Sequence, residues 1–196
     1  MSDYSFFFSH NNYFINERVG LFKFNQVYKV FDSDGRQIGL IQQKMPGYLK
    51  ALSLLINKSM FPFQLFIKDN DDQVLATVKR GWTFWQSKIS VLDKDERVIA
   101  YIHSKFKLVK PEFRILDTEY RPFAVVKGDW KAWNFSITDK ENNRLGTISK
   151  KWNGILKETF TTADKYVVSI EPEVAEDNQK IAIVATAITI DMVLKE

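Results

Sequence analysis

The chain contains 196 residues, of which 45% are hydrophobic and 27% are charged, and this balance excludes a disordered or low-complexity protein. Its 28 basic and 24 acidic side chains leave a net charge of +4, which is low for a dedicated nucleic-acid-binding protein. The chain has no cysteine, so disulfides, thiolate zinc sites and iron–sulfur clusters are excluded, and a cytoplasmic location is expected.

The N-terminal segment does not match a secretory leader. The residues MSDYSFFFSH include an acid where such a leader needs bases, and the apolar run is only FFF. The first regular element predicted after this segment is a strand, YFINE, near Tyr13. Aromatic residues make up 14% of the chain, which favours strands in general.

The next feature is a segment that is repeated five times, each copy aligned on an aspartate. The anchors are Asp32, Asp69, Asp93, Asp117 and Asp139. A β-branched residue lies two positions before each anchor, and a second acid lies two positions after it. Isoleucine or valine lies nine positions after each anchor, and a small residue lies seven positions after it: Gly39, Ala76, Ala100, Ala124 and Gly146.

Each copy has the pattern of a β-hairpin, because a β-branched strand leads into a polar turn and an alternating strand leaves it. The small and the branched residue of the second strand share a face, since side chains alternate along a strand. A small residue at one level of every second strand leaves space for a bulky element against that face. The paired acids are interpreted as turn chemistry, because two carboxylates fall short of the six or more oxygens that calcium requires.

Three segments interrupt or end the strand pattern. Residues 46–58 place apolar side chains on one stripe and predict an amphipathic helix inserted after the first hairpin. Residues 152–160 predict one or two helical turns, and KYVVSIE near Tyr166 predicts the last strand. Residues 181–194 predict a helix that is apolar on all sides and must be buried, yet its length of about 21 Å is short for a bilayer core of about 30 Å.

These elements together predict the fold class. Five hairpins with the first and last strands give twelve strands, and a thin, alanine-containing helix fits the space that the small residues leave. We therefore predict a mainly β protein, a closed twelve-stranded antiparallel barrel around a buried C-terminal α-helix near 181–194. Residues 1–196 are expected to form one domain.

Two segments resemble a known family. The stretch GTISKKWNGILKETFTTADKYVVSIEPE, followed by IAIVATAITIDMVLKE, resembles the C-terminal signature of phospholipid scramblases. The opening YFINERVGLFKFNQVYKVFD resembles bacterial members of that family and the related LURP-one group. The resemblance covers nearly the whole chain and implies the tubby-like fold, a twelve-stranded barrel around a central helix. It also implies ATP-independent movement of phospholipids between leaflets, although the same fold hosts phosphoinositide-binding adaptors.

The resemblance also implies a calcium segment, but few of its ligands are present. The first acid of the family's segment is replaced by Thr162, and only Asp164 and Glu173 remain as charged oxygen donors. Calcium takes six to eight oxygens, several of them from carboxylates. We therefore expect no cofactor and no stabilisation that is specific to calcium.

The chain lacks the motifs of common enzymes. No Gly-rich phosphate loop, GxSxG elbow or HExxH helix is present, and its two histidines, His10 and His103, lie far apart in the sequence. We therefore expect a protein that is not an enzyme, in which any movement of lipids is non-covalent.

Basic residues interleaved with aromatic ones are the candidate membrane-binding side chains. They are Lys79, Arg80, Trp82 and Trp85 in one segment, and Lys105, Lys107 and Lys110 in another. Lysine is attracted to anionic headgroups, and tryptophan prefers the membrane interface. The alternative interpretation is that the rings pack in the barrel wall and that the lysines are ordinary surface groups.

The sequence thus predicts a cytoplasmic, peripheral protein that binds an anionic phospholipid or membrane surface. The alternative is a soluble interaction or ligand-binding module of the same fold, with a protein partner and no lipid activity. Nucleic acid is a poor match as a partner, because a net charge of +4 gives little attraction to phosphates.

Overall fold

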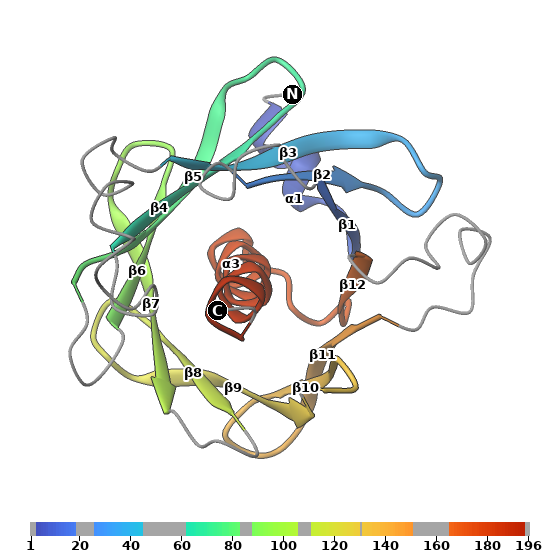
Figure 1. Ribbon diagram of the computed structural model, residues 1–196. Coiled ribbons are helices and arrows are strands. Elements are labelled where there is room, and N and C mark those ends of the chain that lie inside the picture. Colours follow the sequence, from blue (N-terminus) through green and yellow to red (C-terminus); the bar gives the residue numbers. More distant parts are fainter. Residues whose placement is uncertain are drawn as a thin grey trace.

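The computed structural model describes residues 3–18, 26–44, 62–82, 88–105, 111–129, 131–150 and 165–194. It is a ring of strands around one helix, as the end-on view in Figure 1 shows. The strands are β1 (Asn12–Arg18), β2 (Val27–Phe31), β3 (Gln37–Lys44), β4 (Phe63–Lys68), β5 (Val74–Arg80), β6 (Lys88–Asp93), β7 (Val98–Lys105), β8 (Glu112–Leu116), β9 (Pro122–Asp129), β10 (Asn134–Thr138), β11 (Arg144–Ser149) and β12 (Lys165–Ile170). The helices are α1 (Asp3–Phe8) and α3 (Asp177–Leu194).

The strands close on themselves. Each strand is antiparallel to the next one in sequence, and β12 pairs with β1, so the sheet has no free edge. Helix α3 lies inside this ring, and its residues Ile181, Ala185 and Ile188 are fully buried. The predicted twelve-stranded barrel around a C-terminal helix is therefore confirmed. The helices predicted at 46–58 and 152–160 lie outside the described residues.

The repeated positions form the inner surface of the wall. In every hairpin, the β-branched residue before the anchor is the cross-strand partner of the small residue after it. These pairs are Val30–Gly39, Ile67–Ala76, Val91–Ala100, Ile115–Ala124 and Ile137–Gly146, and all of these residues are buried. Because each pair sets one large side chain against a small one, the wall leaves room for the elements inside the barrel.

The five hairpin turns use the anchor aspartate in the same way. In four turns its Oδ1 accepts the N–H groups of the residues two and four positions later, at 2.8–2.9 Å. In the fifth turn, the N–H of Asn143 donates to Asp139 Oδ1 at 2.8 Å. The residue three positions after each anchor has a positive φ, namely Gly35, Asp72, Glu96, Tyr120 and Asn142. The anchors therefore hold the turns, as expected for aspartate in this position.

Acid is expected to lower the free energy of unfolding through these carboxyls. Burial alone would raise the pKa of Asp32, but hydrogen bonds from the backbone and side chain of Arg36 outweigh it, and the pKa lies below its ordinary value. The N–H of Arg121 lowers the pKa of Asp117 in a similar way. A group with a depressed folded pKa stabilises the protein above its unfolded pKa of about 3.9, and this stability is lost as the pH falls through the folded pKa.

The Asp32→Asn variant tests this expectation. Its amide oxygen can still accept the two backbone N–H groups, so the turn is retained while the charge is removed. Urea unfolding between about pH 6 and pH 2 is expected to show a smaller loss of stability for the variant than for the wild type. Parallel pH curves for the two proteins would contradict the role assigned to the carboxylate.

Helix α1 packs against the barrel near β1, β2 and β3 (Figure 1). The sequence analysis assigned no element to these residues. Phe7 and Phe8 are fully buried, and the ring centroids of Phe7 and Tyr13 are 5.7 Å apart. A Cβ atom at Gly39 would lie 2.8 Å from the Phe7 ring and 2.2 Å from the carbonyl oxygen of Lys68. The Phe7 ring of α1 therefore occupies the space beside Gly39.

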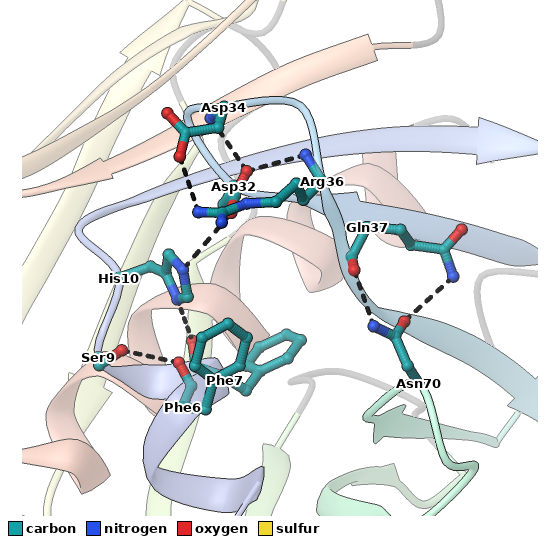
Figure 2. A network of polar contacts seen from close by, with 9 residues as sticks. All are labelled: Phe6, Phe7, Ser9, His10, Asp32, Asp34, Arg36, Gln37 and Asn70. Atoms are coloured by element: carbon teal, nitrogen blue, oxygen red, sulfur yellow. Dashed lines mark hydrogen bonds and ion pairs between the residues drawn. The ribbon is translucent and has the colours of Figure 1, made fainter.

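A polar contact continues from α1 to the first hairpin turn, as Figure 2 shows. His10 places Nδ1 3.3 Å from the carbonyl oxygen of Phe7 and Nε2 3.9 Å from Oδ2 of Asp32. The same oxygen of Asp32 is also bound by Arg36, whose Nε donates to Oδ2 at 2.9 Å. Through its contacts with Phe7 and Asp32, His10 thus links the end of α1 to the aspartate that organises the turn.

Helix α3 begins at Asp177, whereas the sequence analysis predicted a start near residue 181. Its first turn is polar and consists of Asp177, Asn178, Gln179 and Lys180. The helix was predicted from its run of apolar residues, so the prediction did not include this polar first turn. An acid in the first turn is nevertheless favourable, because its charge complements the positive end of the helix dipole.

Candidate functional site

The outer surface of β5, β6, β8 and β9 has an excess of positive charge. Four basic residues point outward from these strands, and we call them the basic face: Lys79, Lys88, Arg114 and Lys127. Their chain neighbours Val78, Ile89, Phe113 and Val126 are buried in the barrel interior. Since side chains alternate across a strand, the four bases share the outer side.

The strand register brings the basic face together from distant parts of the sequence. Lys88 is opposite His103 on β7, and His103 is opposite Arg114 on β8. Lys127 is opposite Glu112, the acid that lies among these bases. Glu112 accepts a hydrogen bond from Arg114 Nε at 2.8 Å, and its other oxygen lies 3.7 Å from Lys127 Nζ. Asp129, exposed at the end of β9, shares the outer side with Lys127, and two carboxylates do not neutralise four bases, so the face is positive.

Two tyrosines and Lys88 form a compact cluster at this face. The rings of Tyr101 and Tyr120 are stacked, with centroids 4.4 Å apart and an interplanar angle of 8°. Lys88 Nζ lies 4.7 Å and 4.5 Å from the two ring centroids, and it donates to the Tyr120 hydroxyl at 2.5 Å. Tyr120 has a φ of 63°, which costs roughly 1–2 kcal/mol for a residue with a side chain. Stacking of the two rings stabilises the fold by about 0.5–1.5 kcal/mol, so it offsets most of that conformational cost.

The electrostatics of the cluster keep the positive charge on Lys88 rather than on the histidine. The hydrogen bond to Tyr120 raises the pKa of Lys88. Burial lowers the pKa of His103, and the nearby charge of Lys88 lowers it further. Because the ordinary pKa of histidine is about 6.5, His103 is neutral at neutral pH. The charge of the face thus comes from its lysines and arginine.

The structure separates the predicted residues of the first candidate segment. Lys79 is half-buried on the outer side of β5, as the membrane-binding interpretation requires. Arg80 is 4% exposed, and its guanidinium carbon lies 4.6 Å from the centre of the Phe63 ring. Arg80 is thus part of the barrel wall and does not belong to the surface group in which the sequence analysis placed it. Trp82 is 46% exposed just beyond the end of β5, and Trp85 lies outside the described residues.

Of the second candidate segment, the structure describes the backbone of Lys105 alone. This residue ends β7, and its cross-strand partner is Glu112. Lys105 therefore occupies a strand position beside the basic face. Lys107 and Lys110 lie outside the described residues, so their role stays a prediction.

The remaining predicted ligands do not form a site in the described part of the chain. Glu173 is exposed in the segment between β12 and α3, and Asp164 lies outside the described residues. Among the residues that the structure describes, no group of three or more histidine, aspartate or glutamate side chains is placed to hold a metal ion. The expectation that calcium does not specifically stabilise the protein at this segment stays a prediction.

A buried polar pair joins the central helix to the wall. The Tyr28 hydroxyl lies 2.9 Å from Oδ2 of Asp191, which is 1% exposed, and 2.8 Å from Oε1 of Gln26. An oxygen or nitrogen buried away from water needs such a partner, because leaving it unpaired costs about 1–3 kcal/mol. This pair fixes the last turns of α3 against β2 and therefore belongs to the fold.

A hollow of about 420 Å³ lies on the outer wall over β3 and β4. It is lined by Gln42, Gln43, Lys44, Phe66, Lys68 and Val74. The Lys68 ammonium in it is already paired with Asp72 at 2.8 Å and contacts Gln42 at 3.2 Å. Within the part of the chain that the structure describes, the hollow thus offers one ammonium not paired with an acid, that of Lys44, and it is a weaker site for an anion than the basic face.

The sequence analysis missed Lys88, Arg114 and Lys127. Strand alternation would have placed each of them on the outer side, because each lies next to an apolar residue that faces inward. The contact of Lys88 with Tyr120 had no sequence signal, since 32 residues separate the two. Such a cluster exists only once the strands are in register.

None of the helices in the described ranges has the length and apolar content needed to cross a membrane.

Comparison with known proteins gives one family and one solved structure. A model of the Scramblase family matches residues 14–196. A protein of Arabidopsis thaliana solved by X-ray crystallography has the same overall fold, with a TM-score of 0.52, 11% identity, and coverage of 92% of this chain and 91% of that chain. At this identity the likeness concerns the fold alone. None of the curated proteins compared with the chain matches it.

Proposed function

Because the chain belongs to the Scramblase family, we propose that it is a scramblase-like protein that binds anionic phospholipid surfaces peripherally and without covalent chemistry. The basic face carries this proposal, since four bases and two acids, Glu112 and Asp129, share the outer side of β5, β6, β8 and β9. Each lysine close to an anionic membrane contributes about 1 kcal/mol of attraction. The Scramblase family is not a family of enzymes.

We further propose that the protein moves phospholipids between leaflets without ATP. The interior of the barrel is occupied by α3, whose residues from Ile181 to Ile190 are fully buried. A lipid headgroup or acyl chain therefore meets the protein at its outer surface. We propose that any transfer depends on the basic face and on the membrane next to it.

The second candidate is an interaction module of the same fold that has no lipid activity. The filled interior favours it, because a barrel packed around its own helix needs no ligand to be stable. Under this alternative the basic face would contact an acidic protein. The two candidate functions predict different binding to vesicles, so a vesicle-binding experiment distinguishes them.

Vesicle sedimentation tests the proposal with two pairs of substitutions. Lys88→Gln with Lys127→Gln removes two charges from the basic face, and Lys94→Gln with Lys140→Gln removes two exposed charges from hairpin turns. On vesicles of equal parts phosphatidylcholine and phosphatidylserine, the first pair is expected to weaken binding roughly 30-fold, or about 2 kcal/mol. The second pair is expected to bind nearly as the wild type does.

Salt and lipid composition provide the controls. Binding is expected to weaken as salt shortens the Debye length from about 10 Å at 0.1 M to about 3 Å at 1 M. Vesicles of phosphatidylcholine alone are expected to bind little protein. Equal weakening by both pairs would show that net charge, and not the basic face, is responsible. If the wild type sediments with neither kind of vesicle, the interaction module is the correct function.

A further inference from the structure

The two ends of the barrel are built differently. All five hairpin turns lie at one end, together with the start of α3, and we call this the turn end. The opposite ends of the strands form the loop end, which includes Lys44, Asp129, Lys165 and the buried Arg80. Lys88 begins β6 at this end, but its ammonium reaches the Tyr120 hydroxyl in a hairpin turn, so Lys88 is not counted with the loop end. Consecutive strands run in opposite directions, so their connections alternate between the two ends, and the five aspartate-anchored turns, which join every second pair of strands, all fall at one end.

The turn end is acidic. Its described acids are Asp32, Asp34, Asp69, Asp71, Asp72, Asp93, Asp95, Glu96, Asp117, Glu119, Asp139, Glu141, Glu171, Glu173, Glu176 and Asp177. Its described bases are Arg36, Lys68, Lys94, Arg97, Arg121, Lys140, Arg144 and Lys180. Acids outnumber bases two to one there, because each of the five turns has an anchor aspartate and a second acid two positions after it.

The loop end has the opposite charge. Its described bases are Arg18, Lys44, Lys79, Lys105, Lys127, Lys131, Lys150, Lys165 and the buried Arg80. Its described acids are Glu17, Glu112, Asp129 and the buried Asp191. The net charge of +4 for the chain thus hides a separation of charge along the barrel axis.

The distance between the ends makes this separation effective. A strand of eight residues such as β7 is about 26 Å long, and a tilt of 35–45° leaves roughly 20 Å along the barrel axis. The Debye length at physiological salt is about 8 Å. A membrane that touches the loop end is therefore screened from the acids of the turn end, whereas the inverted orientation would press those acids against anionic headgroups.

An exposed aromatic side chain gives a second, independent indication. Trp82 is 46% exposed at the loop end, two residues beyond the end of β5. Tryptophan is enriched at the level of lipid headgroups, because its ring is apolar while its N–H remains a hydrogen-bond donor. Its position agrees with the orientation that the charges favour.

We propose that the protein docks on an anionic phospholipid bilayer in a single orientation, with the loop end, including Lys79 and Lys127 of the basic face, toward the headgroups and the turn end in solution. This inference rests on the proposed membrane binding and adds the direction of docking. The occupant of the surface is a lipid bilayer, because the positive charge is spread over several strands and the exposed aromatic ring lies beside it.

The cysteine-free chain allows a direct test of the orientation. Ala132→Cys and Ser33→Cys each introduce one thiol at an exposed, uncharged residue, the first at the loop end and the second in the first hairpin turn. Each thiol receives the same environment-sensitive fluorophore. The labelled proteins are mixed with equal-part phosphatidylcholine and phosphatidylserine vesicles that carry a headgroup-linked quencher, and sedimentation is measured on the same samples.

The label at residue 132 is expected to be quenched at least threefold more strongly than the label at residue 33, with equal sedimentation of the two proteins. Equal quenching, or stronger quenching at residue 33, with normal sedimentation would overturn the orientation and leave membrane binding intact. Failure of both labelled proteins and of the unlabelled wild type to sediment would overturn the proposed function and this inference with it. A Trp82→Ala protein is expected to keep the same ratio of quenching while binding less tightly, since charge alone sets the direction.

Discussion

Replacing Phe7 with alanine is expected to lower the free energy of unfolding by about 3–5 kcal/mol, the usual loss for a buried phenylalanine. The ring is fully buried, and its centroid lies 4.9 Å from that of Phe8 and 5.7 Å from that of Tyr13. It also fills the space beside Gly39, where no side chain exists to expand into the cavity. Urea unfolding of wild type and variant measures the difference.

The adjacent phenylalanine provides a matched control. Phe6 is 47% exposed and makes one edge contact with His10, at a centroid distance of 5.0 Å. Phe6→Ala removes the same atoms from the same helix but leaves no internal cavity, so we expect a loss of less than about 1 kcal/mol. If the two variants lose equal stability, α1 does not anchor to the barrel through Phe7.

Replacing Ala185 with leucine is expected to cost about 3 kcal/mol, the upper part of the range for overpacked cores. Ala185 is fully buried in the part of α3 that lies inside the ring. The wall cannot open to accept a larger side chain, because every strand is hydrogen-bonded to a neighbour on both sides. The added volume must therefore be absorbed by strained rotamers or by displacement of the helix.

Ala175→Leu serves as the control for this substitution. Ala175 is exposed just before α3, so the same change there is expected to alter stability by no more than about 0.5 kcal/mol. Thermal melts of both variants, with near-ultraviolet circular dichroism to confirm native packing, provide the measurement. A stable, native-like Ala185→Leu protein would be incompatible with a helix enclosed by the barrel.

The folding predictions and the membrane predictions are independent of each other. Phe7 and Ala185 lie inside the barrel, whereas the basic face and Trp82 lie on its surface. Substitutions of exposed lysines are expected to change stability little. A loss of vesicle binding in a variant of the basic face can therefore be attributed to the surface and not to unfolding.

Much of the candidate site was beyond the reach of the sequence analysis. Lys79 and Arg80 were assigned to one surface together, as basic residues beside aromatic ones, but the structure places Arg80 in the wall. The repeat also favours the wall, since Val78 occupies an inward column and Arg80, two residues later, shares its face. Arginine is tolerated there because its guanidinium stacks on Phe63 at 4.6 Å.

The sequence by itself determined the barrel and its central helix. Strand alternation, turn chemistry and the small residue of each copy are local patterns, so five aspartate-anchored hairpins could be recognised without knowledge of the fold. The all-apolar segment that became α3 required burial on every side, and a ring of small residues such as Ala100 and Ala124 supplied the place for it.

Only the tertiary structure decided which surface residues act together. The basic face joins residues from Lys79 to Lys127, and the cluster of Lys88 with Tyr120 spans two hairpins. The anchoring of α1 by Phe7 and the contact of Tyr28 with Asp191 likewise join distant segments. These contacts depend on closure of the barrel and on the register of its strands, which side-chain periodicity within one segment does not specify.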